Sequence, residues 1–310
     1  MKKVLVTGTY DIIHPAHLKA LKQARRCGDF LVAVVARDST VERVKGYRPF
    51  FTETERVENL KKLRIANRVL LGNRGDKLKV VEALKPDVLC LGYDQIAFTE
   101  DLKKKLALRG LYPQIIRLRQ FNQERYRTSK LHENGLVALK NIDPTIITEP
   151  RYATRRNFLK KPLYQNSIIL TREHIAKKLS RVQKKLRARG CRLKVWDAYR
   201  PLSVQKQMWQ AVPDERYIGN PATGPFHTRA AAIDCTVVDE QGRQLPMPTS
   251  FDKFSRRAHR NFPGHTPEER KNMRLLERLM AAEGFVPLES EWWHFSDPDW
   301  KSYPVLDISI

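Results

Sequence analysis

The sequence predicts two domains, the first of them an α/β doubly wound parallel sheet. A chain of 310 residues is long enough for two ordinary domains with separate cores. Short apolar runs alternate with helical patterns as far as Leu131, which is the βαβ alternation of a parallel sheet. The alternation then stops without a Gly/Ser-rich linker. We therefore expect domains of residues 1–134 and 135–310, joined near residues 132–135.

The elements of the first domain follow from its apolar patterning. The expected strands are the runs at residues 4–6, 30–36, 69–71, 88–91 and 115–118. The run FLVAVVA at 30–36 is apolar throughout, as is typical of a strand buried on both faces of a sheet. Helices are expected between the strands, over residues 15–27, 52–63, 76–84 and 99–109.

Two helices of the second domain are clear from their spacing and their ends. Residues 171–189 form an amphipathic pattern that stops at Gly190. Residues 266–283 begin with a capping box of Thr266 and Glu269, and Pro267 occupies the first helical position. We interpret the Met-bearing stripe of this second helix as ordinary core packing.

Charge and cysteine content limit the class of protein. The net charge is +24, with 28 basic against 15 acidic residues in residues 1–134 and 30 against 19 in the remainder. Such a charge attracts anions, but no recognised nucleic-acid module appears, so we interpret it as a solvated basic surface rather than a nucleic-acid site. The four cysteines form no C-x-x-C pair and are expected to be reduced, buried thiols.

The N-terminus and the overall hydropathy predict a cytoplasmic protein. MKKVLVTG is too short for the apolar core of a signal peptide, and no apolar run reaches the 18 residues of a membrane span. The sequence leaves the oligomeric state open, including a homo-oligomer.

The turn from the first strand into the first helix carries GTYDIIHPAH, residues 8–17. Ligands of open parallel sheets bind outside the carboxyl ends of the strands, and a helix N-terminus there attracts phosphate. His14 and His17 are three residues apart at this helix start and face the same way. Their imidazoles can donate hydrogen bonds to phosphate oxygens during phosphoryl transfer.

This segment resembles the HxGH signature of the cytidylyltransferase-like nucleotidyltransferases, whose Rossmann-like fold fits residues 1–131. The segments VVARDSTVERVKG, LGYDQ and YRTSKL follow in the order found in glycerol-3-phosphate cytidylyltransferases and, more closely, archaeal-type FAD synthases. The resemblance implies that a nucleoside triphosphate binds with magnesium and donates its nucleotidyl group to a phosphorylated small molecule. It implies nucleotide- or phosphate-binding roles for Thr9, Tyr10, His14, His17, Lys45, Asp94, Arg127, Thr128 and Ser129, with the two histidines catalytic. Asp11 is a further candidate for positioning magnesium or the acceptor.

One position departs from this pattern, because the glycine of HxGH is Ala16. Glycine in such a place permits close backbone approach to a ligand. The alternative to an active transferase is a degenerate nucleotide-binding module. The choice between CTP and ATP and the identity of the acceptor stay open, because site chemistry rather than fold decides them.

Two short clusters in the C-terminal third have metal-ligand chemistry. His227 and Asp234 are seven residues apart in PFHTRAAAIDCTV, a spacing that suits a turn and the following strand. Glu291 and His294 are three apart in EWWHF. Two imidazoles and one carboxylate make a zinc set that leaves a position open for water, and a further glutamate can take a proton from that water.

Residues 136–310 resemble the D-alanyl-D-alanine dipeptidases of the zinc D,D-peptidase family, which implies an α+β domain. The ordered blocks are RYATRRNFLKKPLY, WDAYRP, HxxxxAID, MPTSFDKFS and EWWHF. The resemblance implies that His227, Asp234 and His294 hold zinc, that Glu291 is the general base and that Arg200 stabilises the oxyanion. In its apolar setting the Arg200 guanidinium also needs an anionic partner.

The charged ends of a dipeptide need partners of their own, and Asp252 and Tyr199 are the candidates for these contacts. The family pattern SxHxxGxAxD has Pro225 in place of its serine and Ala230 in place of its glycine. Zinc ligation should survive both changes, whereas the preference for D-Ala-D-Ala over longer peptidoglycan peptides stays open. The favoured interpretation is a bifunctional enzyme. A basic nucleic-acid-binding protein with vestigial folds is the alternative from another class, and it would require a steep salt dependence of binding.

Overall fold

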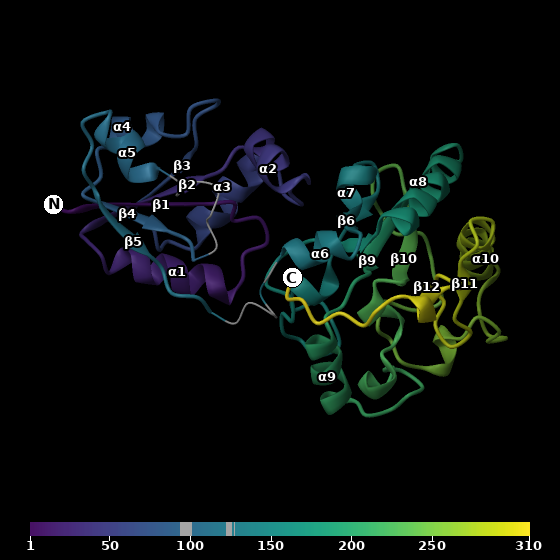
Figure 1. The fold of residues 1–310 in the computed structure, drawn as a ribbon. Helices are drawn as coiled ribbons and strands as arrows, with labels where there is room; N and C mark the ends of the chain where they lie inside the picture. The colour runs from purple at the N-terminus through teal and green to yellow at the C-terminus, as the bar shows by residue number, and fades with distance from the viewer. Residues whose placement is uncertain (94–100, 122–125, 127) are drawn as a thin grey trace. The chain divides into compact units, whose positions relative to one another are not determined.

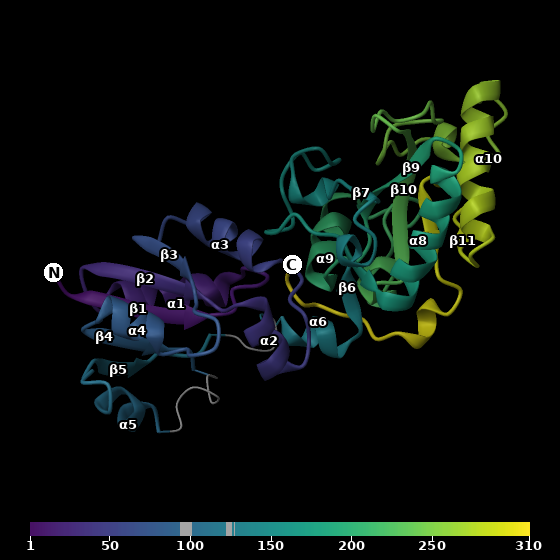
Figure 2. The same cartoon turned by 90° about the horizontal axis from the view of Figure 1, so that it is seen from above.

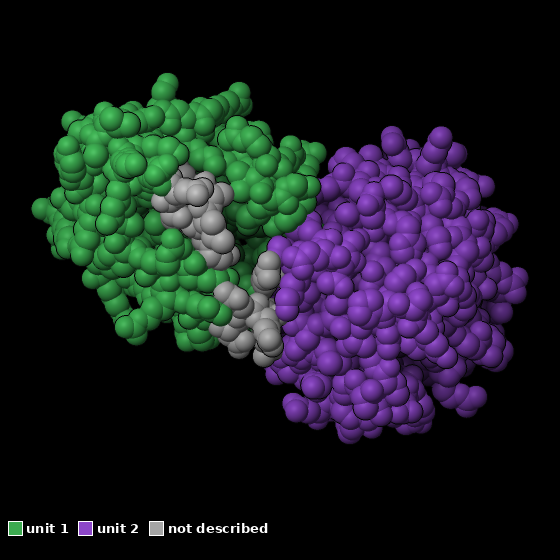
Figure 3. Space-filling view, in the orientation of Figure 1, with its two compact units in different colours: residues 1–128 green, residues 129–310 purple. Residues whose placement is uncertain are grey.

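The computed structural model describes residues 1–93, 101–121, 126 and 128–310. The chain divides into two compact units, unit 1 (Met1–Thr128) and unit 2 (Ser129–Ile310), which Figure 3 distinguishes by colour. The division falls six residues before the predicted boundary at 134/135, because the short helix α6 (Ser129–Glu133) is part of unit 2.

Unit 1 is a five-stranded sheet with all pairs parallel. Its strand order is β3 (Arg68–Leu71), β2 (Phe30–Val35), β1 (Lys3–Gly8), β4 (Val88–Leu91), β5 (Gln114–Arg117). The helices are α1 (Pro15–Arg25), α2 (Asp38–Lys45), α3 (Glu53–Lys62), α4 (Lys79–Leu84) and α5 (Leu102–Ala107). The predicted doubly wound fold is confirmed, and the sequence reasoning missed only α2 among these elements.

Alternate strand residues separate the two cores of unit 1. Val4 and Val6 of β1 pack with α1 and α3 on one face of the sheet, whereas Leu5 packs with α4 and α5 on the other. Figure 1 shows α1 and the α4/α5 pair on opposite sides of the strands. The strand order reverses between β1 and β4, so the carboxyl end of β1 lies at the switch point where such sheets bind ligands.

Unit 2 contains a mixed five-stranded sheet. Its order is β11 (Val286–Pro287), β12 (His294–Ser296), β10 (Ala232–Asp239), β9 (Cys191–Asp197), β7 (Ile147–Thr148), antiparallel except for the β7–β9 pair. A separate antiparallel pair joins β6 (Leu136–Ala138) to β8 (Leu170–Arg172). The helices after α6 are α7 (Leu139–Ile142), α8 (Glu173–Arg187), α9 (Leu202–Ala211) and α10 (Pro267–Ala281).

Helices α8 and α10 share one core with β9 and β10, and Figure 2 shows the two helices beside each other. The predicted helices at 171–189 and 266–283 correspond to α8 and α10. The Thr266–Glu269 capping box is present, and Met273 and Met280 are buried as predicted. All four cysteines are free; Cys90 and Cys235 are buried, whereas Cys27 and Cys191 are half-buried. Within the described part of the chain, no helix is long and apolar enough to span a membrane.

Candidate active sites

The three predicted metal ligands of unit 2 are brought together by strand register. Asp234 of β10 lies directly opposite His294 of β12 in their antiparallel pairing. His227 lies in the short 3₁₀ helix η3 (Phe226–Arg229), which immediately precedes β10. One turn and two neighbouring strands therefore deliver all three side chains to one buried point.

The donor atoms of these side chains converge in a way that fits a metal ion. His227 Nε2 lies 3.3 Å from both His294 Nδ1 and an Asp234 carboxylate oxygen, and His294 Nδ1 lies 3.0 Å from the other oxygen. The three ligand atoms are within 4.8 Å of one another. His227 Nδ1 is 2.7 Å from the Ala198 carbonyl, so a proton on Nδ1 leaves the Nε2 lone pair free for a metal. Burial opposes ionisation of Asp234, but His227 and His294 still hold its pKa well below the usual value.

Arg200 is fixed beside this triangle by a set of buried partners. Its guanidinium donates to Asp197 Oδ2 from Nε (3.0 Å) and from a terminal nitrogen (2.8 Å), and to Gln205 Oε1 (2.8 Å). The same group lies 3.8 Å from Asp234 and 5.0 Å above the ring of Tyr152. Asp197 also accepts a 2.7 Å bond from the Tyr164 hydroxyl. This arrangement supplies the anionic partner that a buried arginine requires.

Two further carboxyl groups, Glu291 and Asp252, share the electrostatic environment of the triangle. Burial, followed by the negative charges of Asp234 and Asp252, raises the pKa of Glu291 well above its usual value. Burial and Asp234 likewise raise the pKa of Asp252 to about 7. One Asp252 oxygen accepts a 3.0 Å bond from the Tyr152 hydroxyl, and the other oxygen is buried without a partner among the described residues.

Tyr199, the other predicted substrate contact, has a different role. Its hydroxyl donates to the Ile308 carbonyl and accepts from the Ile308 amide, both at 2.9 Å. The side chain is buried and anchors the C-terminal segment. We therefore do not retain Tyr199 as a substrate contact.

The two departures from the family pattern lie at the ends of η3. Ala230 follows η3 with φ +56°, in the left-handed region that a glycine adopts at little cost. Pro225 precedes η3, and its carbonyl accepts bonds from the Thr228 amide and hydroxyl. The structure keeps the turn that carries His227 despite both changes.

In unit 1, the structure brings His14 and His17 together at the start of α1. Their rings stack with centroids 3.8 Å apart and planes inclined by 16°. Burial lowers the pKa of His14 to about 4, and burial together with His14 lowers the pKa of His17 well below its usual value. Nδ1 of each ring is buried and lacks a hydrogen-bond partner in the described part of the chain. Each imidazole thus has a ring nitrogen available to a ligand, and it donates a hydrogen bond to an anion when that nitrogen carries a proton.

The residues around these histidines form a compact loop at the end of β1. Tyr10 is buried with φ +51°, and its ring lies edge-on to His17 at 5.5 Å. A Cβ at Gly8 would lie 2.7 Å from the Tyr10 ring, so this position accepts only glycine without a shift. Lys45, the last residue of α2, is close enough to His17 to lower the pKa of that histidine further.

Arg56 of α3 fixes this loop, although the sequence reasoning did not identify it. The fully buried guanidinium donates to the carbonyls of Thr9 (2.5 Å), Ala36 (2.8 Å) and Phe51 (3.2 Å). It also pairs with Asp38 at 2.6 Å. The loops after β1 and β2 and the segment before α3 are thus held by one cation.

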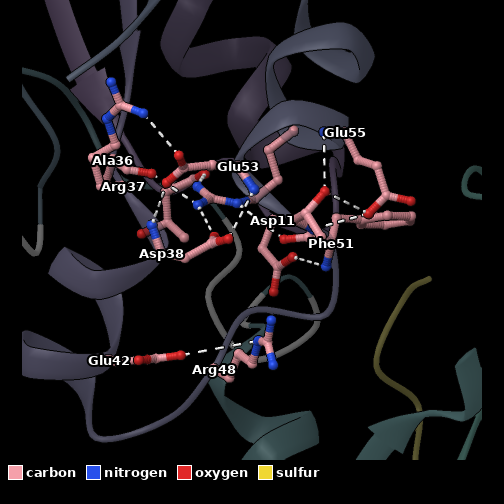
Figure 4. A network of polar contacts seen from close by, with 12 residues as sticks. Asp11, Ala36, Arg37, Asp38, Glu42, Arg48, Phe51, Glu53 and Glu55 are labelled. Carbon is pink, nitrogen blue, oxygen red and sulfur yellow. Dashed lines mark hydrogen bonds and ion pairs between the residues drawn. The ribbon is translucent and has the colours of Figure 1, made fainter. Parts of the chain in front are cut away.

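Asp11 also ties the loop after β1 to the segment before α3. Its two carboxylate oxygens accept 2.9 Å bonds from the Phe50 and Phe51 amides, as Figure 4 shows for Phe51. Nearby, Arg37 pairs with Glu53 at 2.7 Å (Figure 4). These contacts show a structural role for Asp11 and leave its suggested part in magnesium binding untested.

The remaining residues predicted for the N-terminal site are Asp94, Arg127, Thr128 and Ser129. Asp94 and Arg127 fall outside the described residues. Thr128 ends unit 1, and Ser129 begins α6 of unit 2. Tyr126, which the prediction did not name, stacks on His14 with centroids 5.8 Å apart.

Sequence reasoning also missed the supporting layer of the unit 2 site. Tyr152 is the second and Tyr164 the last residue of the block RYATRRNFLKKPLY, and Asp197 lies in WDAYRP. Tyr152 donates to Asp252, and Tyr164 donates to Asp197, which in turn accepts from Arg200, so both blocks support the side chains around the candidate metal triangle. An arginine and an aspartate in one short apolar block were the available signal.

Comparison with known proteins assigns the two halves of the chain separately. The family profile described as D-ala-D-ala dipeptidase matches residues 132–306, and the profile described as cytidylyltransferase-like matches residues 5–134. The D-alanyl-D-alanine dipeptidase of Escherichia coli is 37% identical over 171 residues, which is 55% of this chain and 89% of that protein.

The N-terminal relatives include FAD synthases. The FAD synthase of Aciduliprofundum boonei is 37% identical over 157 residues, covering 51% of this chain and 99% of that protein. A solved structure from Thermoplasma volcanium, titled a lipopolysaccharide core biosynthesis protein, shares 39% identity over 39% of this chain and 99% of its own, with a TM-score of 0.38.

Proposed function

The chain belongs to the D-Ala-D-Ala dipeptidase family through residues 132–306 and to the cytidylyltransferase-like family through residues 5–134, and we propose that each half performs its own reaction. In this proposal residues 135–310 hydrolyse D-alanyl-D-alanine with zinc. Residues 1–134 transfer a nucleotidyl group from a magnesium-bound nucleoside triphosphate to a phosphorylated small molecule, with release of pyrophosphate.

The observation that carries the peptidase proposal is the excess of carboxyl groups around the His227–Asp234–His294 triangle. Asp197, Asp234, Asp252 and Glu291 act electrostatically on one another, and Arg200 is the cation that they share. Such a set favours a divalent cation together with the ammonium end of a peptide.

Each side chain then has a distinct task. His227, Asp234 and His294 would hold zinc, which supplies a Lewis acid that lowers the pKa of water to about 7. Glu291 would accept a proton from the attacking water and return it to the leaving nitrogen. Arg200 would stabilise the negative charge that develops on the carbonyl oxygen. The unpartnered oxygen of Asp252 fits the substrate ammonium.

The test is release of D-alanine from D-Ala-D-Ala by zinc-loaded protein. Glu291→Gln should abolish release, because amide and carboxyl groups have the same shape but the amide cannot accept the proton. Glu289→Gln, an exposed glutamate two residues earlier, is the matched control and should retain full release. Zinc binding without hydrolysis of the dipeptide would reject the proposed substrate, and hydrolysis of longer D-amino-acid peptides would then assign the site to them through the change at Pro225.

For unit 1, the proposal rests on the stacked, uncharged His14 and His17 pair at the switch point of the sheet. Their free nitrogens would donate hydrogen bonds to phosphate oxygens, most strongly as charge develops in transfer. Lys45 would add positive charge beside them. FMN is the first acceptor to test, because the relatives include FAD synthases.

The test mixes FMN with ATP or CTP and magnesium and follows pyrophosphate and the flavin product. His17→Ala should remove activity while leaving D-Ala-D-Ala hydrolysis intact, and Glu291→Gln should do the reverse. If the parent protein binds a nucleotide without forming pyrophosphate with FMN or with a polyol or sugar phosphate, residues 1–134 are a nucleotide-binding module instead.

A further inference from the structure

A buried carboxylate outside the candidate site, Asp297, follows directly after the strand that carries His294. Asp297 is 1% exposed, and its backbone amide donates a 2.8 Å bond to the Ala231 carbonyl. This bond extends the pairing of β12 with β10 by one step beyond Ser296, which lies opposite Ala232. The side chain therefore lies at the end of the two strands that supply Asp234 and His294.

Helix α8 neutralises this carboxylate. Lys178 Nζ lies 2.8 Å from Asp297 Oδ2, and His174 Nε2 lies 3.6 Å from the same oxygen. Oδ1 accepts bonds from the Asp299 amide (3.0 Å) and from the Tyr303 hydroxyl (3.4 Å). The Tyr303 hydroxyl is also 3.1 Å from His174 Nε2, so Asp297, His174 and Tyr303 each contact the other two.

Tyr303 also contacts η3, the 3₁₀ helix that carries His227. The Tyr303 carbonyl accepts a short bond from the Arg229 guanidinium. The Arg229 carbonyl in turn accepts a 3.0 Å bond from Arg172 Nε, and the Arg172 guanidinium lies 4.1 Å above the Tyr303 ring. Arg229 is the last residue of η3, two positions after His227.

We propose that Asp297 is a positioning residue for the metal centre, which ties β12 and η3 to α8 and so fixes His294 and His227 relative to Asp234. None of the side chains in this frame is a metal ligand or a proposed catalytic group. The inference rests on the proposed function in one respect, namely that the triangle binds a divalent metal.

The metal triangle needs three donors from three backbone segments, and each of these segments can shift independently of the others. The pairing of β10 with β12 fixes Asp234 relative to His294, but β12 is only three residues long. Outer contacts that hold ligand-bearing segments typically contribute 10- to 100-fold to metal affinity.

The test uses Asp297→Asn, which keeps the shape of the side chain and removes its charge. The matched control is Glu283→Gln, because Glu283 is also nearly buried and also pairs with two cations of α8, Arg181 and Lys185, both at 2.6 Å. Glu283 lies just after α10, and its carboxylate contacts α8 rather than β12 or η3 among the described residues. Both variants lose an α8 ion pair, so stability alone does not separate them.

The measurements are Co²⁺ affinity by chelator competition and the visible absorption spectrum of the Co²⁺ protein, which reports ligand geometry independently of activity. We expect Asp297→Asn to bind Co²⁺ about 10-fold more weakly, with a shifted spectrum. Glu283→Gln should stay within about twofold of the parent, with an unchanged spectrum. Equal affinity and spectrum for Asp297→Asn and the parent would overturn the proposal.

Tyr303→Phe keeps the test decisive if Asp297→Asn does not fold. It removes only the hydroxyl that joins Asp297 to His174 and retains the ring below Arg172. A shifted Co²⁺ spectrum in this variant supports the frame, and an unchanged spectrum rejects it. Failure of the parent protein to bind Co²⁺ would instead reject the proposed metal site itself.

Discussion

The two candidate sites favour ligands of opposite charge. In unit 1, two imidazoles with lowered pKa values lie near a lysine and offer uncommitted nitrogens to an anion. In unit 2, Arg200 interacts with several buried carboxyl groups, and the pKa values of Asp197, Asp252 and Glu291 are raised. Burial disfavours the charged form in both places, so it suppresses positive charge in one site and negative charge in the other.

The surroundings of titratable residues, rather than any single residue, determine the charge of the ligand that each site favours. Histidines without a carboxylate partner stay neutral when buried and await an anion. Buried carboxyl groups close to one another have raised pKa values, as Asp252 and Glu291 do, and a bound cation favours their ionised form. The sign of the charge that each site binds can therefore be inferred from the direction of the pKa shifts together with the buried geometry.

The largest expected effect is a loss of stability that is confined to unit 1. Arg56→Met should destabilise unit 1 by about 3–5 kcal/mol, because it leaves Asp38 and several carbonyl oxygens without their shared donor. The measurement is a thermal melt by calorimetry, in which the unit 1 transition should fall and the unit 2 transition stay in place. Equal shifts of both transitions would show that the two units unfold together.

The next effect concerns the arginine of the unit 2 site. Arg200→Lys keeps the charge but loses the forked contact with Asp197 and the bond to Gln205. We expect kcat for D-Ala-D-Ala to fall by about 100- to 1000-fold, with a smaller change in zinc affinity. The exposed Arg216→Lys is the control. Loss of zinc binding in parallel with kcat would assign Arg200 to the metal set rather than to the oxyanion.

Proton exchange on ligand binding tests the opposite charges of the two sites directly. At pH 6 a divalent metal should release protons from unit 2, because its charge lowers the raised pKa values of Glu291 and Asp252. A nucleoside triphosphate should take up protons at unit 1, because its phosphates raise the pKa of His14 from about 4. Calorimetry in buffers of different ionisation enthalpy measures both numbers, each on the order of one proton or less.

Two variants test which side chains release or take up these protons. Glu291→Gln should reduce the release on metal binding and leave the uptake on nucleotide binding unchanged. His14→Asn should do the opposite. Proton exchange of the same sign at both sites would contradict the comparison of the two units.

The helices and strands could largely be predicted from the sequence, whereas the residues that hold the two candidate sites in place could not. Apolar runs gave every strand of unit 1, because a buried parallel strand is continuous in sequence. The three proposed metal ligands could be named from the sequence because η3 and β10 are only two residues apart and His294 lies in a short aromatic block. Arg56 and Asp297 were not recognisable, because their partners are distant in sequence and a single charged residue in a helix or after a strand usually indicates a solvated surface.

The smallest effect concerns a backbone position in the turn that carries His227. Ala230 adopts φ +56°, which costs a residue with a Cβ about 1 kcal/mol, whereas glycine adopts it freely. Ala230→Gly should therefore change the stability of unit 2 by less than about 0.5 kcal/mol, because the buried methyl group that is lost, worth about 0.8 kcal/mol, offsets most of the relieved strain. Ala188→Gly is the control, because Ala188, the residue after α8, has φ −62° and glycine there relieves no backbone strain. Denaturant unfolding of the metal-free protein measures both variants. Destabilisation of Ala230→Gly beyond that limit would mean that packing of the Ala230 methyl group outweighs the backbone strain, and that the turn has adapted to alanine.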